Sequence, residues 1–298
     1  MAKSQTQIKG LIINSALYLL AIGVAILVGY FLYDYLIKID RLLLVLVTDI
    51  IATLVIFIAS TIFRNTSLYD PYWSFIPIVI AIYWFIVGLI EYEAGPPQVV
   101  ILVVVGMYGL RLTYNWIRSW EGLMHEDWRY VKFRKEKPKL FWFINLTGLQ
   151  LMPTVVVFLG CIPLKPAFIN NIKIDNVFYI IGLIIAVSAI FIEAIADEQQ
   201  YAFRKKKQPG ELLNVGLWGF SRHPNYFGEI SFWWGIYFLG LAGDTSSWWW
   251  MIAGPIAMVI LFLFVSIPMM EKRLKERYPD YEEYQKRVSM LIPWFKKK

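Results

Sequence analysis

Four polar side chains in the last third of the sequence are spaced so that one helix would carry them along a single face. Glu193 and Asp197 lie four residues apart, and Tyr201 and Arg204 continue the series at spacings of four and three. Residues three or four apart are neighbours on a helix surface. The pattern therefore predicts a polar stripe, and these residues are candidates for a binding site.

The densest group of such residues follows at 221–229, where the sequence reads Ser-Arg-His-Pro-Asn-Tyr-Phe-Gly-Glu. Glu229 lies in an otherwise apolar segment. A carboxylate inside a membrane span indicates a functional site, unless it is a neutral group bound to a neighbouring helix. Pro224 suits the first turn of a helix because it has no N–H to lose there. A helix N-terminus beside Arg222 and His223 would suit an anion.

Arginines give a second reason to expect an anionic ligand, because the guanidinium group matches phosphate oxygens. Four of them could act together: Arg204, Arg222, Arg273 and Arg287. No glycine-rich dinucleotide motif and no Walker sequence accompanies them. The sequence has two histidines, far apart, and one cysteine, so we expect no metal site. The pattern predicts a large anionic cofactor without identifying it.

The elements that must position these residues are membrane helices. Of the 298 residues, 58% are hydrophobic and only 17% are charged, whereas a soluble domain has about a quarter charged residues. Six apolar segments are long enough, or nearly so, to cross the bilayer as helices: 10–33, 42–63, 73–90, 140–163, 176–196 and 248–270. Two more, 98–117 and 226–243, carry Arg111 and Glu229. We expect an all-α, polytopic helical bundle with about seven or eight transmembrane helices.

Lysine and arginine predict the orientation of this bundle. With eight spans, all but four of the 29 basic residues fall on one side, together with both termini. The positive-inside rule makes that side cytosolic, so both termini are expected in the cytosol. The same rule explains the net charge of +7 without a nucleic-acid partner. A bacterial inner membrane and the endoplasmic reticulum fit equally well.

The chain changes character near residue 64. Residues 1–63 form a nearly pure lipid-facing segment, broken by Asp49, for which we favour a structural polar contact. Residues 64–298 carry the candidate site and form the expected catalytic domain. Within it, Asp70 lies in a polar turn, and Tyr108 and Arg111 are three residues apart, on one helix face. The spacing of tyrosines near 278–284 predicts an amphipathic C-terminal tail that lies on the bilayer face.

At this point the sequence resembles a known family. Residues 216–235, with the string at 221–229, resemble the C-terminal signature of the steroid 5-alpha-reductases, and most of all a branch of membrane proteins of unknown function grouped with them. The segments around Glu193 and Asp197, the Pro-Gly-Glu at 209–211 and the tail at 271–295 resemble the rest of that region. The resemblance covers about residues 64–298 and is most specific in the last hundred.

The resemblance implies a membrane reductase that moves hydride from NADPH to a carbon–carbon double bond conjugated to a carbonyl, in a steroid or isoprenoid-like lipid. Glu193, Asp197, Arg204, Asn225 and Glu229 would lie along the cofactor, with Arg222, His223 and Tyr226 as neighbours. The remaining candidates for cofactor binding are Tyr201, Arg111, Glu271, Arg273 and Arg287. The expected partners are a lipid-like substrate and membrane lipids, and the sequence does not address the oligomeric state.

The resemblance also implies a catalytic pair, Asp70 and Tyr108. A tyrosine hydroxyl polarised by a carboxylate can donate to the carbonyl oxygen as hydride arrives. Aspartate replaces the glutamate of the steroid enzymes, so the substrate pocket is expected to differ. Alternatively, Asp70 caps a turn before Pro71 and Tyr108 is a packed aromatic.

Two other functions stay open. The Arg-His-Pro-Asn-Tyr string is shared in outline by isoprenylcysteine carboxyl and phospholipid methyltransferases. Glu271 and Arg273 resemble those of sterol double-bond reductases and isoprenylcysteine carboxyl methyltransferases. The first alternative is therefore an S-adenosylmethionine-dependent membrane methyltransferase. The second is a non-enzymatic membrane scaffold of the same fold.

Overall fold

A computed structural model describes residues 4–208 and 210–296 of the chain. Within these ranges nearly every residue is helical and there is no strand, apart from one isolated bridge between Ser221 and Ser289. Pro209, part of the Pro-Gly-Glu segment of the sequence, lies outside the described residues. The all-α prediction is confirmed.

Seven helical segments of the described chain are long and apolar enough to cross a membrane. They are α1 (Gln5–Leu36), α2 (Arg41–Ile62), η1–α3 (Thr66–Tyr69, Tyr72–Glu91), α4 (Pro96–Ser119), α6–η2–α7–α8 (Phe141–Ile144, Asn145–Leu151, Met152–Cys161, Leu164–Ile169), α9 (Val177–Lys206) and α11–α12–η4–α13 (Trp248–Met251, Ala253–Leu261, Phe262–Ser266, Ile267–Arg277). An eighth long helix, α10 (Pro224–Gly243), is not among these seven. The protein is a multi-pass helical membrane protein, as predicted.

The remaining helices are short and lie outside those spans. They are α5 (Trp128–Glu136), η3 (Gly216–Gly219) and α14 (Tyr281–Arg287). The helices η1 and η3 are 3-10 turns, whereas η2 and η4 are π-helical turns inside longer α-helices.

The chain forms two compact units, which are described separately below. Unit 1 comprises residues 1–83 and 108–162, and unit 2 comprises residues 84–107 and 163–298. The boundaries therefore fall inside α3, inside α4, and between α7 and α8. These units are defined by packing. They do not test the predicted boundary at residue 63 between the N-terminal helices and the catalytic domain, which stays a prediction.

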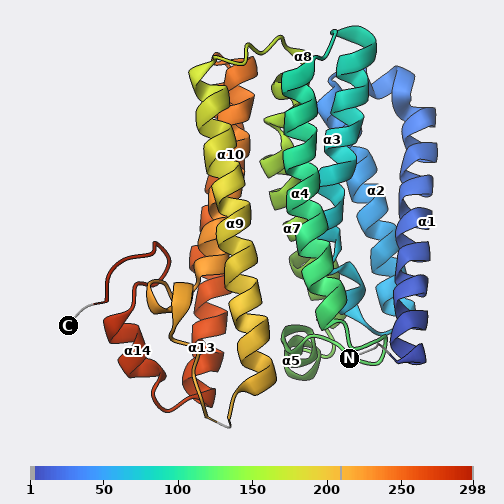
Figure 1. The fold of residues 1–298 in the computed structure, drawn as a ribbon. Coiled ribbons are helices and arrows are strands. Elements are labelled where there is room, and N and C mark those ends of the chain that lie inside the picture. Colours follow the sequence, from blue (N-terminus) through green and yellow to red (C-terminus); the bar gives the residue numbers. More distant parts are fainter. Residues whose placement is uncertain (1–3, 209, 297–298) are drawn as a thin grey trace. The chain divides into compact units, whose positions relative to one another are not determined.

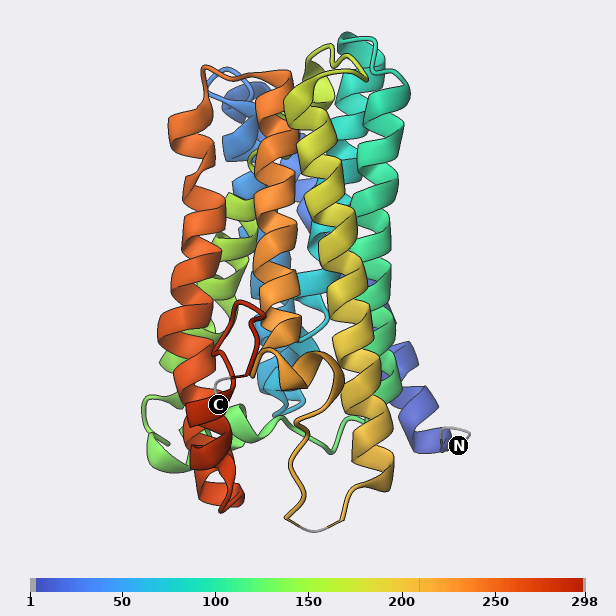
Figure 2. The same ribbon diagram turned by 60° about the vertical axis from the view of Figure 1, so that its left-hand side comes forward.

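In unit 2, α9 and α10 pack side by side through small residues (Figures 1 and 2). A Cβ atom on Gly235 would lie 2.7 Å from the backbone nitrogen of Ala186, and one on Gly228 would lie 2.9 Å from Cβ of Glu193. At Gly182 a Cβ would meet Leu239 at 2.8 Å. The backbones therefore approach as closely as glycine permits, which is how membrane helices associate where lipid offers no hydrophobic drive.

Replacing Gly235 with alanine is expected to push α9 and α10 apart, because the new methyl group would overlap the backbone of Ala186. Overpacking of this kind costs about 1–3 kcal/mol. Thermal unfolding in mild detergent should show a clearly lowered midpoint. Gly106→Ala in α4 is the matched control, because nothing lies within 4 Å of its new Cβ atom. Equal midpoints for the two variants would contradict the tight α9–α10 interface.

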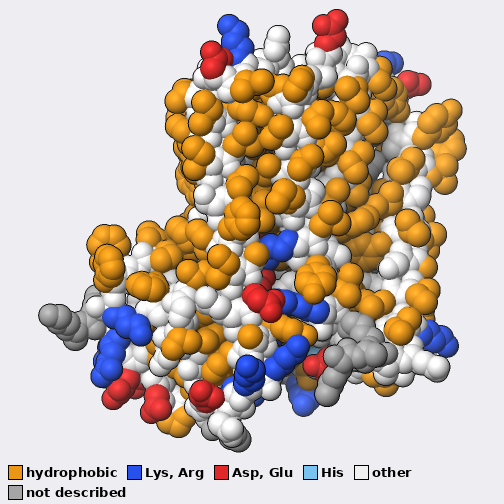
Figure 3. Space-filling model, in the orientation of Figure 1, with side chains coloured by type: hydrophobic (Ala, Val, Ile, Leu, Met, Phe, Trp, Pro, Cys, Tyr) orange, Lys and Arg blue, Asp and Glu red, His pale blue; other side chains and the backbone are white. Residues whose placement is uncertain are grey.

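Hydrophobic side chains cover the outer surface of the long helices, and charged ones gather near the helix ends (Figure 3). Large exposed residues follow the outer faces of α9 and of α12–η4, among them Ile184, Phe191, Ile260 and Phe264. Such a surface belongs in lipid. In unit 2 the lower end of α9 in Figure 1 meets the loop that leads to η3 and α10, and the candidate site residues lie there.

Candidate functional site

The polar stripe predicted at 193–204 lies on one helix, α9. Glu193 and Asp197 are buried, Tyr201 is half-buried and Arg204 is exposed. The stripe therefore runs from the protein interior to the surface. A ligand bound along this stripe would contact the carboxylates at its inner end and the guanidinium of Arg204 at its outer end.

The loop before α10 is fixed to the same end of α9. The indole Nε1 of Trp218 donates to the carbonyl of Ala196 at 3.1 Å, and the backbone nitrogen of Leu217 donates to Oε1 of Gln199 at 2.9 Å. Gly216 has a φ of +61° and a Cβ there would strike Gln199 at 2.6 Å, so only glycine suits this position. These contacts hold the signature segment against the polar stripe.

Helix α10 begins as the sequence predicts. His223 is its N-cap residue and Pro224 occupies the first turn. Glu229 follows one turn later and is buried, with the indole Nε1 of Trp233 donating to its Oε1 at 2.9 Å. Asn225 is half-buried in the first turn. The predicted intramembrane carboxylate is therefore a well-held acceptor inside unit 2.

Arg222 is engaged by the C-terminal part of the chain. Its Nε donates to Oε1 of Glu271 at 2.7 Å, and its Nη1 donates to the carbonyls of Gln285 at 2.9 Å and Val288 at 2.8 Å. Gln285 donates in turn to Oε2 of Glu271 at 2.7 Å. A phosphate would have to compete with these partners. The expected role of Arg222 in holding phosphates stays a prediction, and its observed role is to clamp the tail.

The other basic candidates lie closer to solvent. Arg204 is exposed at the end of α9, and Arg287 is exposed on α14 with Oε2 of Glu283 3.8 Å from its Nη2. Arg273 is half-buried on α13. By contrast, the side chain of Arg222 is only 10% exposed, and Nε and Nη2 of Arg111 are buried.

The tyrosines of the tail pack against the protein, and the predicted position of the tail on the bilayer face stays a prediction. Tyr278, Tyr281 and Tyr284 are buried with Val288 in one hydrophobic cluster. The hydroxyl of Tyr284 donates to the carbonyl of Trp218. Burial raises the pKa of the Tyr281 and Tyr284 phenols. Periodicity alone does not distinguish a face that meets lipid from one that meets protein.

His223 stands beside a π-helical turn. Its ring stacks on Tyr226 with centroids 5.3 Å apart and planes 5° apart, and Tyr226 contacts Phe262 of η4 at 4.8 Å. Its Nε2 lies 3.3 Å from Oε1 of Glu271. Turns of π-helix occur frequently at functional sites. A buried histidine with a carboxylate partner is suited to accept or donate a proton.

Unit 1 holds the residues predicted to meet a substrate carbonyl. Asp70 follows η1, and its Oδ1 accepts a hydrogen bond of 2.6 Å from the hydroxyl of Tyr130 in α5. Tyr108 is fully buried in α4, and Arg111 is half-buried one turn later. The pairing of Asp70 with Tyr108 stays a prediction, whereas the pair with Tyr130 is observed. Sequence reasoning missed Tyr130, since a separation of sixty residues carries no local signal.

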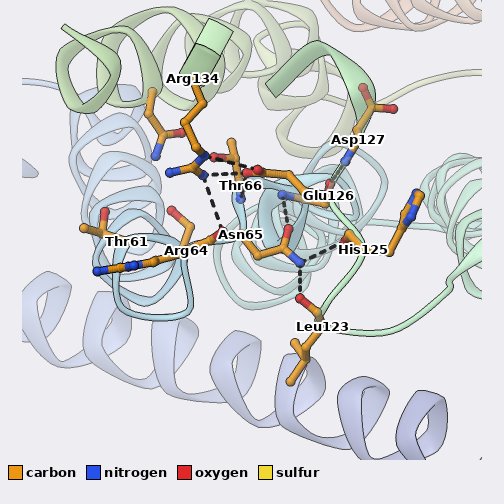
Figure 4. A network of polar contacts seen from close by, with 12 residues as sticks. Thr61, Arg64, Asn65, Thr66, Leu123, His125, Glu126, Asp127 and Arg134 are labelled. Carbon is orange, nitrogen blue, oxygen red and sulfur yellow. Dashed lines mark hydrogen bonds and ion pairs between the residues drawn. The ribbon is translucent and has the colours of Figure 1, made fainter. Parts of the chain in front are cut away.

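A network of polar contacts holds this turn in place (Figure 4). Nδ2 of Asn65 donates to the carbonyls of Leu123 and His125 at 2.7 and 3.0 Å, and the backbone nitrogen of Thr66 donates to Oε1 of Glu126 at 2.8 Å. Nη2 of Arg134 donates to the same oxygen at 2.7 Å. The turn that carries Asp70 is thereby fixed to the loop that leads to Tyr130.

A second carboxylate–tyrosine pair lies deeper in unit 1. Oδ1 of Asp49 accepts a hydrogen bond of 2.6 Å from the hydroxyl of Tyr72. Nearby, Thr154 bonds Thr53 and Tyr69 at 2.8 and 2.7 Å. The internal partner that we expected for Asp49 is therefore Tyr72.

Several carboxylates are deeply buried in the described residues. Asp49, Glu193, Asp197 and Glu229 are buried, and the one buried histidine is His223. No group of three or more histidine, cysteine or acidic side chains in the described chain could hold a metal ion. The site in unit 2 thus offers acceptors inside and basic groups at its rim.

A family model described as "Protein of unknown function (DUF1295)" matches residues 56–288. The chain belongs to this family. The DUF1295 match spans both units and includes every candidate residue named above. It confirms the expected branch of membrane proteins of unknown function, and the link to steroid 5-alpha-reductases stays a prediction.

Two relatives of this DUF1295 protein match different lengths of the chain. Uncharacterized protein C594.04c of Schizosaccharomyces pombe is 25% identical over 253 residues, which are 77% of this chain and 73% of that protein. Methanethiol S-methyltransferase 1 of Bradyrhizobium diazoefficiens is 34% identical over 94 residues, which are 30% of this chain and 29% of that protein. The second match therefore spans less than a third of either protein. No solved structure matches the chain.

Proposed function

We propose that this protein is an S-adenosylmethionine-dependent methyltransferase that acts on a lipid-soluble substrate at the membrane surface. The observation that carries the proposal is a group of buried carboxylates. In unit 2, Glu193, Asp197 and Glu229 are all buried, on the neighbouring helices α9 and α10. A cationic sulfonium suits such a site, because opposite charges attract strongly where water is excluded.

The side chains present fit this cofactor. Glu193, Asp197 and Glu229 would accept hydrogen bonds from ribose hydroxyls and from the ammonium group, since ionised carboxylates are strong acceptors. When bound, the cofactor supplies an electrophilic methyl group whose bond to sulfur breaks as the bond to the nucleophile forms, leaving a neutral thioether. The nucleophile gives up one proton.

His223 would accept that proton. Glu271 lies 3.3 Å from Nε2 of His223, and the proposal places the substrate at the other ring nitrogen. A carboxylate in this position orients the ring. Arg222 holds the same carboxylate at 2.7 Å, so Glu271 acts from a fixed position.

The relative with a named activity supports this type of reaction. Its name describes methyl transfer to methanethiol, and the match covers 30% of this chain. For this chain the substrate class follows from the position of the site, at the end of apolar helices. We infer a lipid-soluble nucleophile such as a thiol. The cytosolic placement of the site and of both termini is part of the same proposal.

A second candidate is the NADPH-dependent reduction of a double bond conjugated to a carbonyl. The hydrogen bond of 2.6 Å between Tyr130 and Asp70 favours it, because this reaction needs a proton donor beside the carbonyl oxygen. Burial raises the pKa of the Tyr130 phenol, so the proton is retained at neutral pH. Asn225 and Glu229 match the reductase signature. The phosphates of NADPH would depend on exposed Arg204 and Arg287, since Arg222 is engaged.

Cofactor binding separates these functions. The purified protein is titrated in detergent with S-adenosylmethionine, NADPH and NADH while its unfolding temperature is recorded. A ligand that binds only the folded state raises that temperature with the logarithm of its concentration. Stabilisation by S-adenosylmethionine alone supports the proposal. Stabilisation by NADPH alone would replace it with the reductase, and no stabilisation at all would favour a scaffold.

Replacing Tyr130 with phenylalanine tests the role of the pair in unit 1. A methyltransferase does not use this hydroxyl, so we expect methyl transfer from radiolabelled S-adenosylmethionine to change less than about threefold. A general acid contributes about 10²- to 10⁴-fold to a rate. The second candidate therefore predicts a loss of that size in NADPH oxidation with an enone lipid. Asp70→Asn, which keeps an acceptor for Tyr130, serves as the companion variant.

A further inference from the structure

The last described residues of unit 2, together with the segment before α10, expose several large apolar side chains. We call this surface the tail patch; its members are Val215, Phe220, Met290, Ile292, Trp294 and Phe295. Their exposed fractions range from 39% for Met290 to 76% for Phe295. Phe220 and Phe295 contact each other edge to face, with centroids 6.4 Å apart. Two distant parts of the chain therefore contribute to one patch.

Hydrogen bonds fix the backbone of the tail patch to the loop before α10. The backbone nitrogen of Trp294 donates to the carbonyl of Phe220 at 3.0 Å, and Oγ of Ser221 donates to the carbonyl of Leu291 at 2.7 Å. The backbone nitrogen of Arg222 donates to the carbonyl of Ser289 at 2.8 Å. These bonds order the backbone of the segment. The apolar side chains are therefore presented outward on a fixed backbone.

The neighbourhood of the patch indicates what covers it. The segment after α14 lies beside the loop that leads to α10, and it follows α13, which ends a candidate membrane span (Figure 1). Exposed acidic and basic residues of α14, such as Glu283 and Arg287, lie on the same tail, outside the patch. Lys296, which follows Phe295, is exposed, and its Nζ lies 3.3 Å from the carbonyl of Asn214. Tryptophan beside lysine is the composition of the membrane–water interface.

We propose that the tail patch inserts into the interfacial region of the lipid bilayer, with Lys296 beside the anionic headgroups. The occupant is lipid, because α13 and the patch belong to one unit and α13 leaves the membrane at this end. A membrane contact of this kind does not depend on the proposed enzymatic activity. It would hold the segment of Ser221 and Arg222 at the bilayer surface.

Spin labels at single cysteines measure this insertion. In the full chain with Cys161→Ala, cysteines replace Ile292 and Phe295 in turn, and the protein is reconstituted in vesicles of phosphatidylcholine and phosphatidylglycerol. Glu283→Cys on the charged part of α14 is the aqueous reference. Phe264→Cys on the exposed face of η4 is the lipid reference. Labels in the patch are expected to collide with dissolved oxygen more than with a water-soluble nickel chelate, as the lipid reference does.

Two results would overturn the proposal. Collision with the nickel chelate equal to that of Glu283→Cys would place the patch in water. Protection from both reagents would mean that protein, such as a second copy, covers the patch. The thermal unfolding midpoint of each labelled variant reports whether that preparation is folded. The same collision measurement in detergent micelles shows how far the contact depends on a bilayer.

Discussion

Arg222→Ala is expected to release the C-terminal tail from the rest of unit 2. The arginine donates to Glu271 and to two carbonyls of the tail, and both members of the ion pair are largely buried. Removing one partner of a buried pair costs about 3–5 kcal/mol, because the remaining charge is left without compensation. Even the lower figure corresponds to more than a hundredfold change in the population of the released form.

Chymotrypsin provides the readout, since it cleaves after Tyr281 and Tyr284, whose rings are buried while the tail is bound. Cleavage at these two residues, followed by mass spectrometry, should accelerate by about a hundredfold or more in the variant. Arg222→Lys should be intermediate, because an ammonium group lacks the planar fork that reaches three acceptors. Arg287→Ala, which removes an exposed arginine, is the control. Unchanged cleavage in Arg222→Ala would mean that the tyrosine cluster alone holds the tail.

Glu229→Gln is expected to weaken S-adenosylmethionine binding by about ten- to a hundredfold. A hydrogen bond to a charged group contributes about 1.5–3 kcal/mol, and the substitution removes the charge while keeping the size of the side chain. The amide oxygen still accepts from Trp233, so the unfolding temperature without ligand should be nearly unchanged. Isothermal titration in detergent measures the dissociation constant.

Glu198→Gln makes the same change of charge on an exposed part of α9 and serves as the matched control. A dissociation constant that is equal in wild type and Glu229→Gln would exclude Glu229 from the cofactor site. If the affinity for NADPH falls instead, the same residue would belong to the reductase site of the second candidate.

Features that depend on local composition could be predicted from the sequence. The spans follow from runs of apolar residues, and the start of α10 follows from Pro224, which suits only the first turn of a helix. The stripe from Glu193 to Arg204 follows from helical spacing and lies on α9 as expected. In each case the information lies within a few residues of the chain.

Features that depend on distant contacts could not be predicted in this way. Arg222 and Glu271 are 49 residues apart, so no local pattern indicated that Arg222 holds the tail, whereas its role as a phosphate ligand stays a prediction. Asp70 and Tyr130 are 60 residues apart, and a tyrosine in a basic loop carries no sign of a carboxylate partner. The tail tyrosines have amphipathic spacing, but spacing does not distinguish lipid from protein.

The π-helical turn η4 has a consequence for comparing members of this family. In η4 the backbone nitrogen of Ile267 donates to the carbonyl of Phe262, five residues earlier, so this turn contains one residue more than an α-helical turn. Losing one residue within 262–266 would close the turn into a regular α-helix. The side chain at Phe262 would still face Tyr226, and Glu271 would still face Arg222. Alignments of the family should therefore place a one-residue gap inside this span and not in the neighbouring loops.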